Sequence, residues 1–313
     1  MNPAENTHRL ALVNLTSLME RTAGRPEITI GFIDGPVQFD HPDLTRESIR
    51  EIPRRSKGRC ARADSVACLH GTFGAGILSA RRGSVAPAIS PGCTLLIRPV
   101  FREASEAPGA SPAELAAAIL DCVDAKARII NLSLAVADSL SDARWPLEEV
   151  LDYAARKGVI VVAAAGNQGA LGGSAITRHP WVIPVVASDL RGRPISQSNL
   201  GASLGRSGLS APGEGVRSLL AGGGTMISAG TSVAAPFVTG TVALLWSLFP
   251  HATAEAIRRA VTRSSLSRRG AVVPPLLNAE ESYRIMTGGR SHGLKNETAT
   301  RGPENRSATQ RAS

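Results

Sequence analysis

Short apolar runs alternate with amphipathic segments through the middle of the chain. The apolar runs are rich in β-branched residues and end at polar or turn-forming residues, which is typical of strands buried on both faces of a parallel sheet. We predict such strands at residues 27–34, 93–101, 127–135, 159–167 and 181–189. The run VIVVAAAGN at 159–167 is the most apolar of them.

The segments between these runs have the spacing of amphipathic helices. Residues 111–125 have the clearest start, because Ser111 is followed by a proline and then by Glu114, as in a capped helix. The helix predicted at 145–158 stops at Gly158, a residue typical of helix ends. Further helices are predicted at 8–21, from His70 onward, and at 232–248 and 253–263.

The alternation of strands and helices predicts an α/β fold with a mostly parallel central sheet and helices on both faces. In such sheets, ligands bind at the carboxyl ends of the strands. Asp34 and Asn167 end two of the predicted strands. We therefore expect these two side chains to lie on the same edge of the sheet.

We expect three parts in the chain: an N-terminal helical extension at 1–24, one folded domain at 25–287 and a tail at 288–313. The tail is polar and rich in Gly, Ser, Thr and Arg. This composition buries too little apolar surface to offset the entropy of ordering, so the tail is predicted to be disordered.

The chain is basic and has a formal net charge of +9 at pH 7. Bulk charge affects solubility and attraction to acidic partners, and it does not determine the fold. Aromatic residues are only 4% of the chain, and no stacking or basic-helix motif is present, so we expect no nucleic-acid partner. No segment approaches the apolar length of a membrane span, and the start lacks a signal pattern, so we expect a cytoplasmic protein without membrane contact.

An arginine-rich stretch, RRAVTRSSLSRR, carries part of this charge. We predict that its arginines form a solvated helix face, with attraction of an acidic peptide as the alternative. They are Arg258, Arg259, Arg263, Arg268 and Arg269.

The four cysteines do not match the spacing of a zinc site. Cysteines in the cytoplasm are mostly reduced. Cys60 and Cys68 are close in sequence and flank a predicted loop, so the sequence leaves open whether they form a disulfide. Cys93 and Cys122 are predicted to be thiols in the core.

Four residues could together hydrolyse an amide, which requires a nucleophile, a base, a group that orients the base, and donors for the oxyanion. Taken singly, each has a structural explanation that outweighs the chemical one. Asp34 and Asn167 could be turn residues, His70 a residue at a helix start, and Ser232 a helix cap. Of the six histidines, however, His70 stands out for its small neighbours in HGTFGAG.

Taken together, the four residues follow the order Asp, His, Asn, Ser, which is that of subtilisin with its oxyanion asparagine. The sequence resembles the subtilisin-like serine proteases. The resemblance rests on four segments: GFIDGPVQFDHPDL with Asp34, HGTFGAG with His70, VVAAAGNQG with Asn167, and AGTSVAAPFVTG with Ser232. It spans roughly residues 25 to 265 and implies a three-layer subtilisin-like fold.

The resemblance implies a role for each residue. Ser232 would attack the scissile carbonyl, and His70 would take its proton and return it to the leaving amine. Asp34 would hold the imidazole in the useful tautomer, and the side chain of Asn167 would donate to the oxyanion.

The segment NLSLA resembles the family's substrate-binding edge strand, to which an extended peptide would add as a further strand. Its residues are Asn131, Leu132, Ser133, Leu134 and Ala135. Ala135 and Phe73 depart from the family pattern, which has glycine and a second histidine at these positions. The acidic loops that hold calcium in secreted members are not recognisable, so we expect no cofactor.

A closer resemblance is to the cyanobactin-maturation type of these proteases. It rests on IDGPV after the first strand, the pair Cys68 and His70, and PGCTLLIRPVF. This type implies a cytoplasmic enzyme that cuts a leader or follower segment from a ribosomally made precursor peptide, with other proteins of a biosynthetic cluster as partners. Only 35 residues separate Asp34 from His70, which leaves little room for the lid of the macrocyclising type and favours simple leader cleavage.

Two alternatives remain open at this point. The protein could be an intracellular protease of the same fold with broad specificity, or a catalytically silent relative that binds peptides. All four chemical positions are filled, which argues against the silent relative.

Overall fold

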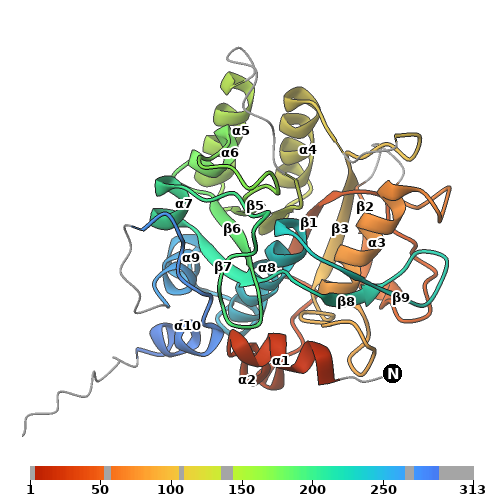
Figure 1. Cartoon of the computed structure of the whole chain (residues 1–313), viewed down its shortest axis with the longest axis horizontal. Coiled ribbons are helices and arrows are strands. Elements are labelled where there is room, and N and C mark those ends of the chain that lie inside the picture. Colours follow the sequence, from red (N-terminus) through yellow and green to blue (C-terminus); the bar gives the residue numbers. More distant parts are fainter. Residues whose placement is uncertain (1–3, 53–57, 106–108, 135–143, 265–270, 289–313) are drawn as a thin grey trace, which may run out of the picture.

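The computed structural model describes residues 4–52, 58–105, 109–134, 144–264 and 271–288. Within them, seven strands form one sheet in which every neighbouring pair is parallel, in the order β2-β3-β1-β4-β5-β6-β7 (Figure 1). The strands of this sheet are β1 (Thr29–Asp34), β2 (Ile49–Glu51), β3 (Thr94–Pro99), β4 (Ile129–Leu132), β5 (Ile160–Ala164), β6 (Ile183–Ser188) and β7 (Leu209–Pro212). A separate antiparallel pair consists of β8 (Val216–Leu219) and β9 (Thr225–Ser228).

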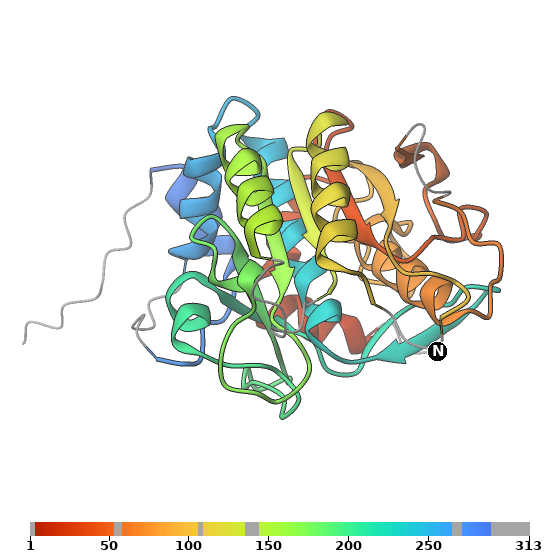
Figure 2. The same ribbon diagram turned by 90° about the horizontal axis from the view of Figure 1, so that it is seen from above.

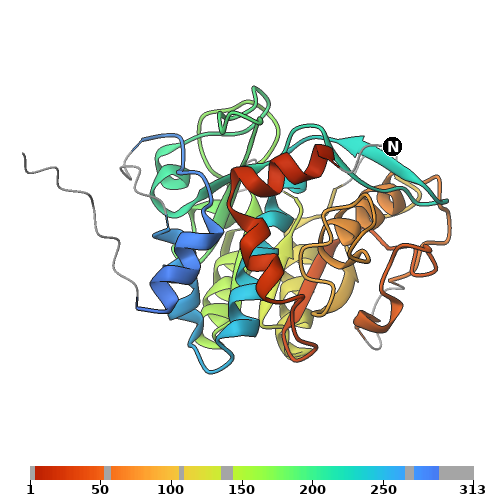
Figure 3. The same ribbon diagram turned by 90° about the horizontal axis from the view of Figure 1, so that it is seen from below.

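Helices cover both faces of the sheet. They are α1 (Ala4–Leu12), α2 (Leu15–Arg21), α3 (Val66–Ser79), α4 (Pro112–Asp124), α5 (Arg144–Arg156), α6 (Ala175–Arg178), α7 (Ala202–Ser207), α8 (Thr231–Leu248), α9 (Ala254–Thr262) and α10 (Ala279–Met286), with a 3-10 turn at Arg46–Ser48. Figure 2 shows α4 and α5 side by side on one face, where they pack on each other and on β1, β3 and β5. On the opposite face α3 and α8 pack on the sheet, with α1, α2, α9 and α10 around them (Figure 3).

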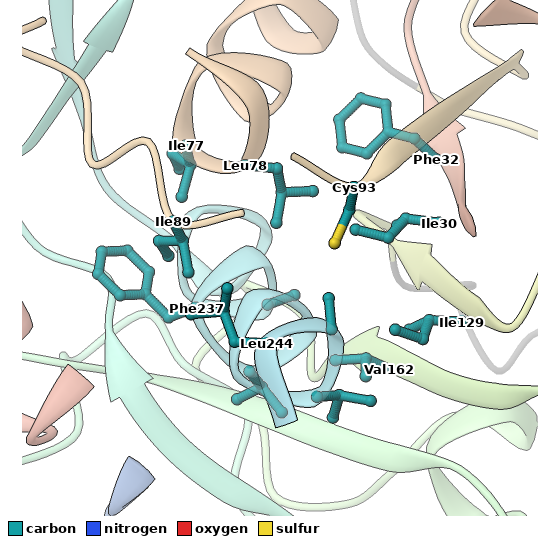
Figure 4. Close-up of a cluster of buried hydrophobic side chains, with 14 of the residues drawn as sticks. Ile30, Phe32, Ile77, Leu78, Ile89, Cys93, Ile129, Val162, Phe237 and Leu244 are labelled. Atoms are coloured by element: carbon teal, nitrogen blue, oxygen red, sulfur yellow. The ribbon is translucent and has the colours of Figure 1, made fainter. Parts of the chain in front are cut away.

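Each face of the sheet has its own apolar core. Ile33, Leu115 and Val161 belong to the core beneath α4 and α5. Figure 4 shows the other core, in which Phe237 of α8 and Ile77 of α3 belong to one buried cluster with residues of the central strands. Because strand side chains alternate between the faces, each central strand contributes to both cores, which explains its unbroken apolar sequence.

Helix α8 runs through the middle of this second core. Its 18 residues have a mean hydropathy of 1.4, which by length and composition alone is enough to cross a membrane. The expectation that no segment approaches such a length is therefore wrong for α8. Of this helix 89% is buried inside the fold, however, as expected for the core helix of a globular domain.

The predicted α/β fold is confirmed, and all five predicted strands are present with shorter ends. The start of α4 is also as predicted, because Ser111 and Glu114 form a reciprocal capping box with a proline in the first turn. Helix α10 was not predicted from the sequence.

The helix predicted at 8–21 is wrong, because two helices occupy this region. Asn14 adopts a left-handed backbone with φ of 52° and separates α1 from α2. Asparagine tolerates this conformation better than most residues, so it is a natural position for the break. Leu15 and Leu18 of α2 are fully buried in the same core as α8.

The predicted basic face of α9 is also partly wrong. Arg258 donates from Nε to the carbonyl oxygen of Trp181 (2.9 Å) and stacks over the Trp181 ring. Arg259 and Arg263 are exposed, as predicted. Arg268, Arg269 and the predicted tail from residue 289 onward lie outside the described residues.

The free thiols Cys93 and Cys122 are buried in the core, as predicted. Burial raises the pKa of Cys93 to about 11 and that of Cys122 even further. Both thiols are therefore protonated near neutral pH and act as small apolar side chains.

Candidate active site

Three of the candidate side chains meet at one edge of the sheet. Asp34 is the last residue of β1, His70 lies in the second turn of α3, and Ser232 is the second residue of α8. The Nδ1 atom of His70 is 2.6 Å from Oδ1 of Asp34, and its Nε2 atom is 3.2 Å from Oγ of Ser232. The fold thus forms a continuous chain of hydrogen bonds from residues 36 and 162 positions apart.

The local structure around His70 and Ser232 differs from the sequence-based expectation in two ways. Helix α3 begins at Val66, four residues before His70, with the side chain of Ser65 as its N-cap. The cap of α8 is Gly230, so the interpretation of Ser232 as a helix cap is wrong. The hydroxyl of Ser232 is hydrogen-bonded to Nε2 of His70.

Two glycines allow β1 and α3 to approach this closely. A Cβ atom at Gly35 would overlap the carbonyl oxygen of Ala67, and one at Gly71 would overlap the carbonyl oxygen of Pro36. The segment after Asp34 and the helix carrying His70 are therefore in backbone contact. The glycines beside the aspartate and the histidine are required by this close approach.

The tautomer of His70 follows from its partners. The carboxylate of Asp34 can only accept, so Nδ1 carries a proton and donates to it. The Nε2 atom is then free of a proton and accepts from the hydroxyl of Ser232. This is the arrangement in which imidazole acts as a base toward a serine hydroxyl.

The environment of His70 makes its imidazole a stronger base than a free histidine side chain. Burial opposes the charge on the imidazole, but the charge of Asp34 and its hydrogen bond outweigh burial, so the pKa of His70 is raised above its ordinary value. The edge of Phe101 packs against the imidazole with ring centroids 5.4 Å apart. The two rings are nearly perpendicular, with an interplanar angle of 84°.

Asp34 is fully buried, and both of the hydrogen bonds to its carboxylate are accepted by the same oxygen atom. Its Oδ1 atom accepts from His70 and also from the backbone N–H of Gly35 (2.6 Å). Its Oδ2 atom is buried and has no hydrogen-bond partner among the described residues. The orientation of the carboxylate is therefore set by Oδ1 alone.

The side chain of Asn167 is held by Thr231, the residue before Ser232. Its Oδ1 atom accepts from the Thr231 backbone N–H (2.8 Å) and from the Thr231 hydroxyl (3.0 Å). The Thr231 hydroxyl in turn accepts from the Gly166 N–H (3.1 Å). With Oδ1 occupied by Thr231, the Nδ2 group remains as the donor of this exposed side chain. Thr231 was not among the predicted site residues, although its place directly before the serine was the available signal.

The predicted substrate segment is only partly at an edge. β4 pairs with β1 on one side and β5 on the other, so the edge-strand prediction is wrong for Asn131 and Leu132. Asn131 is buried, donates to the Ser133 hydroxyl (2.8 Å) and accepts from the Thr239 hydroxyl (2.8 Å). Ser133 and Leu134 follow the end of β4 on the active-site edge of the sheet, and Ala135 lies outside the described residues.

Cys60 and Cys68 form a disulfide, which answers the question left open by the sequence. Cys68 lies in the first turn of α3, two residues before His70. The backbone N–H of Cys60 donates to the carbonyl oxygen of Val37, three residues after Asp34 (3.2 Å). Cys60 thus lies beside the segment that follows Asp34, and the disulfide links Cys60 to the helix that carries His70.

The carboxylate of Glu103 fixes the loop closed by this disulfide. It accepts from the backbone N–H groups of Ala61 (3.0 Å) and Arg62 (2.8 Å) and from the hydroxyl of Ser65 (3.3 Å). Among the described residues, no group of three or more His, Cys, Asp or Glu side chains is placed to hold a metal ion.

The fold and this site define the class of the subtilisin-like serine proteases. The Subtilase family model matches residues 25–303, and the chain belongs to this family.

Curated relatives agree with this assignment. The chain is 32% identical over 229 residues to a thermophilic serine proteinase of Bacillus sp. (strain AK1), covering 72% of this chain and 54% of the relative. It is 31% identical over 198 residues to a thermostable alkaline protease of Halalkalibacterium halodurans, covering 63% of this chain and 52% of the relative. The chain thus spans about half the length of these two relatives.

Solved structures of maturation proteases match over a larger share of their length. A mutant of the protease domain of PatA has a TM-score of 0.78 at 30% identity, covering 85% of this chain and 98% of that chain. The prenylagaramide maturation protease PagA has a TM-score of 0.77 at 29% identity, covering 88% and 99%. The patellamide maturation protease PatG has a TM-score of 0.76 at 20% identity, covering 88% and 96%, a likeness of fold alone.

Proposed function

We propose that this protein is a serine endopeptidase that removes the leader from a ribosomally made precursor peptide. The observation that carries the proposal is the chain of hydrogen bonds from Asp34 through His70 to Ser232. The precursor-processing part is supported by the likeness to the proteases PatA and PagA at 30% and 29% identity.

The chemistry begins with a proton transfer. As Ser232 Oγ attacks the scissile carbonyl carbon, its proton moves to Nε2 of His70, which is unprotonated in the resting site. The imidazolium that forms is stabilised by the buried carboxylate of Asp34. The proton on Nε2 then passes to the leaving amine, and a water molecule repeats the sequence to release the acyl group.

The negative charge that develops on the carbonyl oxygen needs fixed donors. Asn167 supplies its Nδ2 group, whose direction is set by the bonds from Thr231 to Oδ1. Ser232 lies in the first turn of α8, where the backbone N–H groups and the helix dipole favour negative charge. Removing one such side-chain donor typically costs roughly 3–4 kcal/mol of transition-state stabilisation.

The substrate is proposed to bind as an extended chain along Ser133, Leu134 and Ala135. These residues follow β4 in the sequence, and β4 itself is paired on both sides and cannot accept a further strand. Main-chain hydrogen bonds to such a segment require a substrate region that is flexible before it binds. A leader joined to its core peptide by an unfolded segment meets this requirement. Cytoplasmic action, as expected from the sequence, is part of the proposal.

Comparison of a precursor-type peptide library with casein tests the proposal. We expect cleavage at one position with a defined residue preference, and little digestion of casein. Ready digestion of casein at many sites would instead support the alternative of a broad-specificity protease, which the likeness to the bacterial proteinases favours.

Labelling with a fluorophosphonate separates both from a silent peptide-binding relative. The wild-type protein should form an adduct on Ser232, and the Ser232→Ala variant should form none. Absence of an adduct on the folded wild-type protein would exclude the proposed activity.

A further inference from the structure

A pocket of about 460 Å³ lies at the end of the sheet opposite the active site. Arg128 and Val159 in its wall come directly before β4 and β5, whereas Ser133 and Asn167 follow those strands. The lining also includes the charged residues Asp124, Lys126 and Lys157, together with Val123 and Trp246. None of them belongs to the proposed catalytic machinery.

The charge around this pocket is unbalanced. Lys126, Arg128 and Lys157 line it together with a single carboxylate, that of Asp124. Within the part of the chain that the structure describes, none of the three cations forms an ion pair. Three positive charges around one cavity repel one another, and an anion placed among them would remove that repulsion.

Arg128 is held in a fixed position. Its guanidinium lies over the ring of Trp246, 4.1 Å from the centroid. Trp246 is itself buried and donates from Nε1 to the carbonyl oxygen of Ala252 (3.0 Å), so the ring cannot turn away. A guanidinium fixed by stacking keeps its forked donors available for a carboxylate or a phosphate.

This position also removes Arg128 partly from water, and burial lowers the pKa of its guanidinium. A partly desolvated charge costs free energy unless an opposite charge or acceptors compensate for it. The stacking on Trp246 compensates in part, and an anionic ligand would compensate further.

The backbone at Lys126 forms the turn that ends α4, where the N–H of Ala127 donates to the carbonyl oxygen of Cys122 (2.9 Å). Lys126 has φ of 64°, the left-handed region that favours glycine. Its carbonyl oxygen accepts from the Thr29 hydroxyl (2.7 Å), which holds the turn. This turn places Lys126 in the lining of the pocket, next to Arg128 in the sequence.

We propose that this pocket binds an oxyanion group, a carboxylate or a phosphate, through Lys126, Arg128 and Lys157. The inference does not depend on the proposed peptidase function. Two sources supply this chemistry: a free phosphate, or the carboxylates of an acidic peptide, whose carbon atoms would contact the apolar wall of Val123 and Val159.

Binding to the full-length Ser232→Ala protein tests the proposal without cleavage of the probe. Inorganic phosphate is titrated by calorimetry at low salt, and a fluorescent hexapeptide of Glu and Leu by anisotropy. Charged hydrogen bonds are strong enough that Arg128→Gln and Lys157→Gln should each weaken binding about tenfold. Lys157 is exposed, so its variant tests the site even if Arg128→Gln destabilises the fold.

Arg259→Gln is the matched control, because Arg259 is exposed on α9, does not line the pocket, and its loss changes the net charge equally. It should leave binding unchanged. Phosphate binding alone would identify a free anion as the source, and peptide binding that phosphate displaces would identify acidic side chains. No saturable binding of either probe, or equal weakening in Arg259→Gln, would overturn the proposal.

Discussion

At the scale of single residues, the site depends on side chains that fix the direction of others. Asp34 fixes the tautomer of His70, and Thr231 fixes the amide of Asn167. Neither residue is proposed to bond to the substrate. Their removal should therefore change turnover more than substrate binding.

Variants at Thr231 and Asn167 test this division of roles. Asn167→Ala removes a donor to the oxyanion and should lower kcat by about a hundredfold to a thousandfold. Thr231→Val keeps the shape but removes the hydroxyl that holds Oδ1, so we expect a smaller loss in kcat with an unchanged KM. Steady-state kinetics on one cleavable peptide measures both. A rise in KM for Thr231→Val without a change in kcat would contradict the positioning role.

The raised pKa of His70 predicts the pH dependence of activity. The imidazole must be unprotonated to accept the proton of Ser232, so kcat/KM should fall as the pH drops through the pKa of His70. Because Asp34 raises that pKa, the midpoint should lie above the ordinary value of 6.5. In Asp34→Asn the midpoint of the residual activity should move down. An unchanged midpoint would show that another group limits the reaction.

The raised pKa of His70 also affects the stability of the fold, but this contribution falls as the pH rises, whereas activity increases. A group whose pKa is raised by folding stabilises the folded state below its unfolded pKa, and this contribution is lost as the pH rises through the folded pKa. His70 should therefore stabilise the fold most at mildly acidic pH, where it is charged beside Asp34. Activity and this part of the stability thus have opposite pH dependence.

At the scale of elements, the close contact of β1 with α3 and the disulfide at the start of α3 determine where His70 lies. The glycines at 35 and 71 place the two backbones in contact. The Cys60–Cys68 disulfide and Glu103 hold the loop before α3.

Removal of the disulfide should destabilise the protein. A cross-link across eight residues reduces the entropy of the unfolded chain, which corresponds to about 2–3 kcal/mol. We expect this loss of unfolding free energy for Cys60→Ser in urea titrations, with a similar loss for the wild type in a dithiol reductant. The variant itself should not respond to the reductant. Equal stability of the wild type in both redox conditions would show that the bond is absent in solution.

The contact between β1 and α3 gives a further prediction. Gly71→Ala places a methyl group against the carbonyl oxygens of Gly35 and Pro36, so α3 must move away from β1. Activity should fall by at least about tenfold, because a displacement of this kind lengthens the bond from His70 to Asp34. Gly109→Ala controls for the substitution itself, because Gly109 has no positive φ and a Cβ atom there would meet nothing within 4 Å. Crystallography or kinetics can show whether Gly71→Ala leaves the site intact.

At the scale of the whole molecule, the N-terminal helices are part of the folded body although the family match begins only at residue 25. Leu15 and Leu18 are buried with α8, and the backbone N–H of Ala279 in α10 donates to the carbonyl oxygen of Val13 (2.9 Å). The segment therefore connects the start of the chain to α8 and α10.

Leu18→Ala tests whether this segment stabilises the whole fold. Truncation of a buried leucine leaves a cavity and costs about 2–5 kcal/mol. We expect one cooperative unfolding transition shifted to lower urea, whereas Glu20→Ala on the exposed side should have little effect. Two separate transitions would show that the extension unfolds independently of the domain.

The sequence was sufficient to predict the parts of the fold and site that depend on local patterns. The strand ends at Asp34 and near Asn167, and the small residues around His70 and Ser232, are local signals. The β4 pairing that removes Asn131 from the edge depends on strands far away in sequence, so NLSLA alone could not reveal it. The role of Thr231 and the pocket around Arg128 likewise depend on contacts between distant segments.

The central position of α8 has a consequence for synthesis of the protein. This helix packs on α3 and on four strands of the sheet, and it carries Ser232 at its first turn. A chain that stops before residue 231 has Asp34 and His70 but no nucleophile, and it also lacks the helix at the centre of one apolar core. We therefore expect a chain that ends before α8 to be both unfolded and inactive, so that hydrolytic activity appears only once the core is complete.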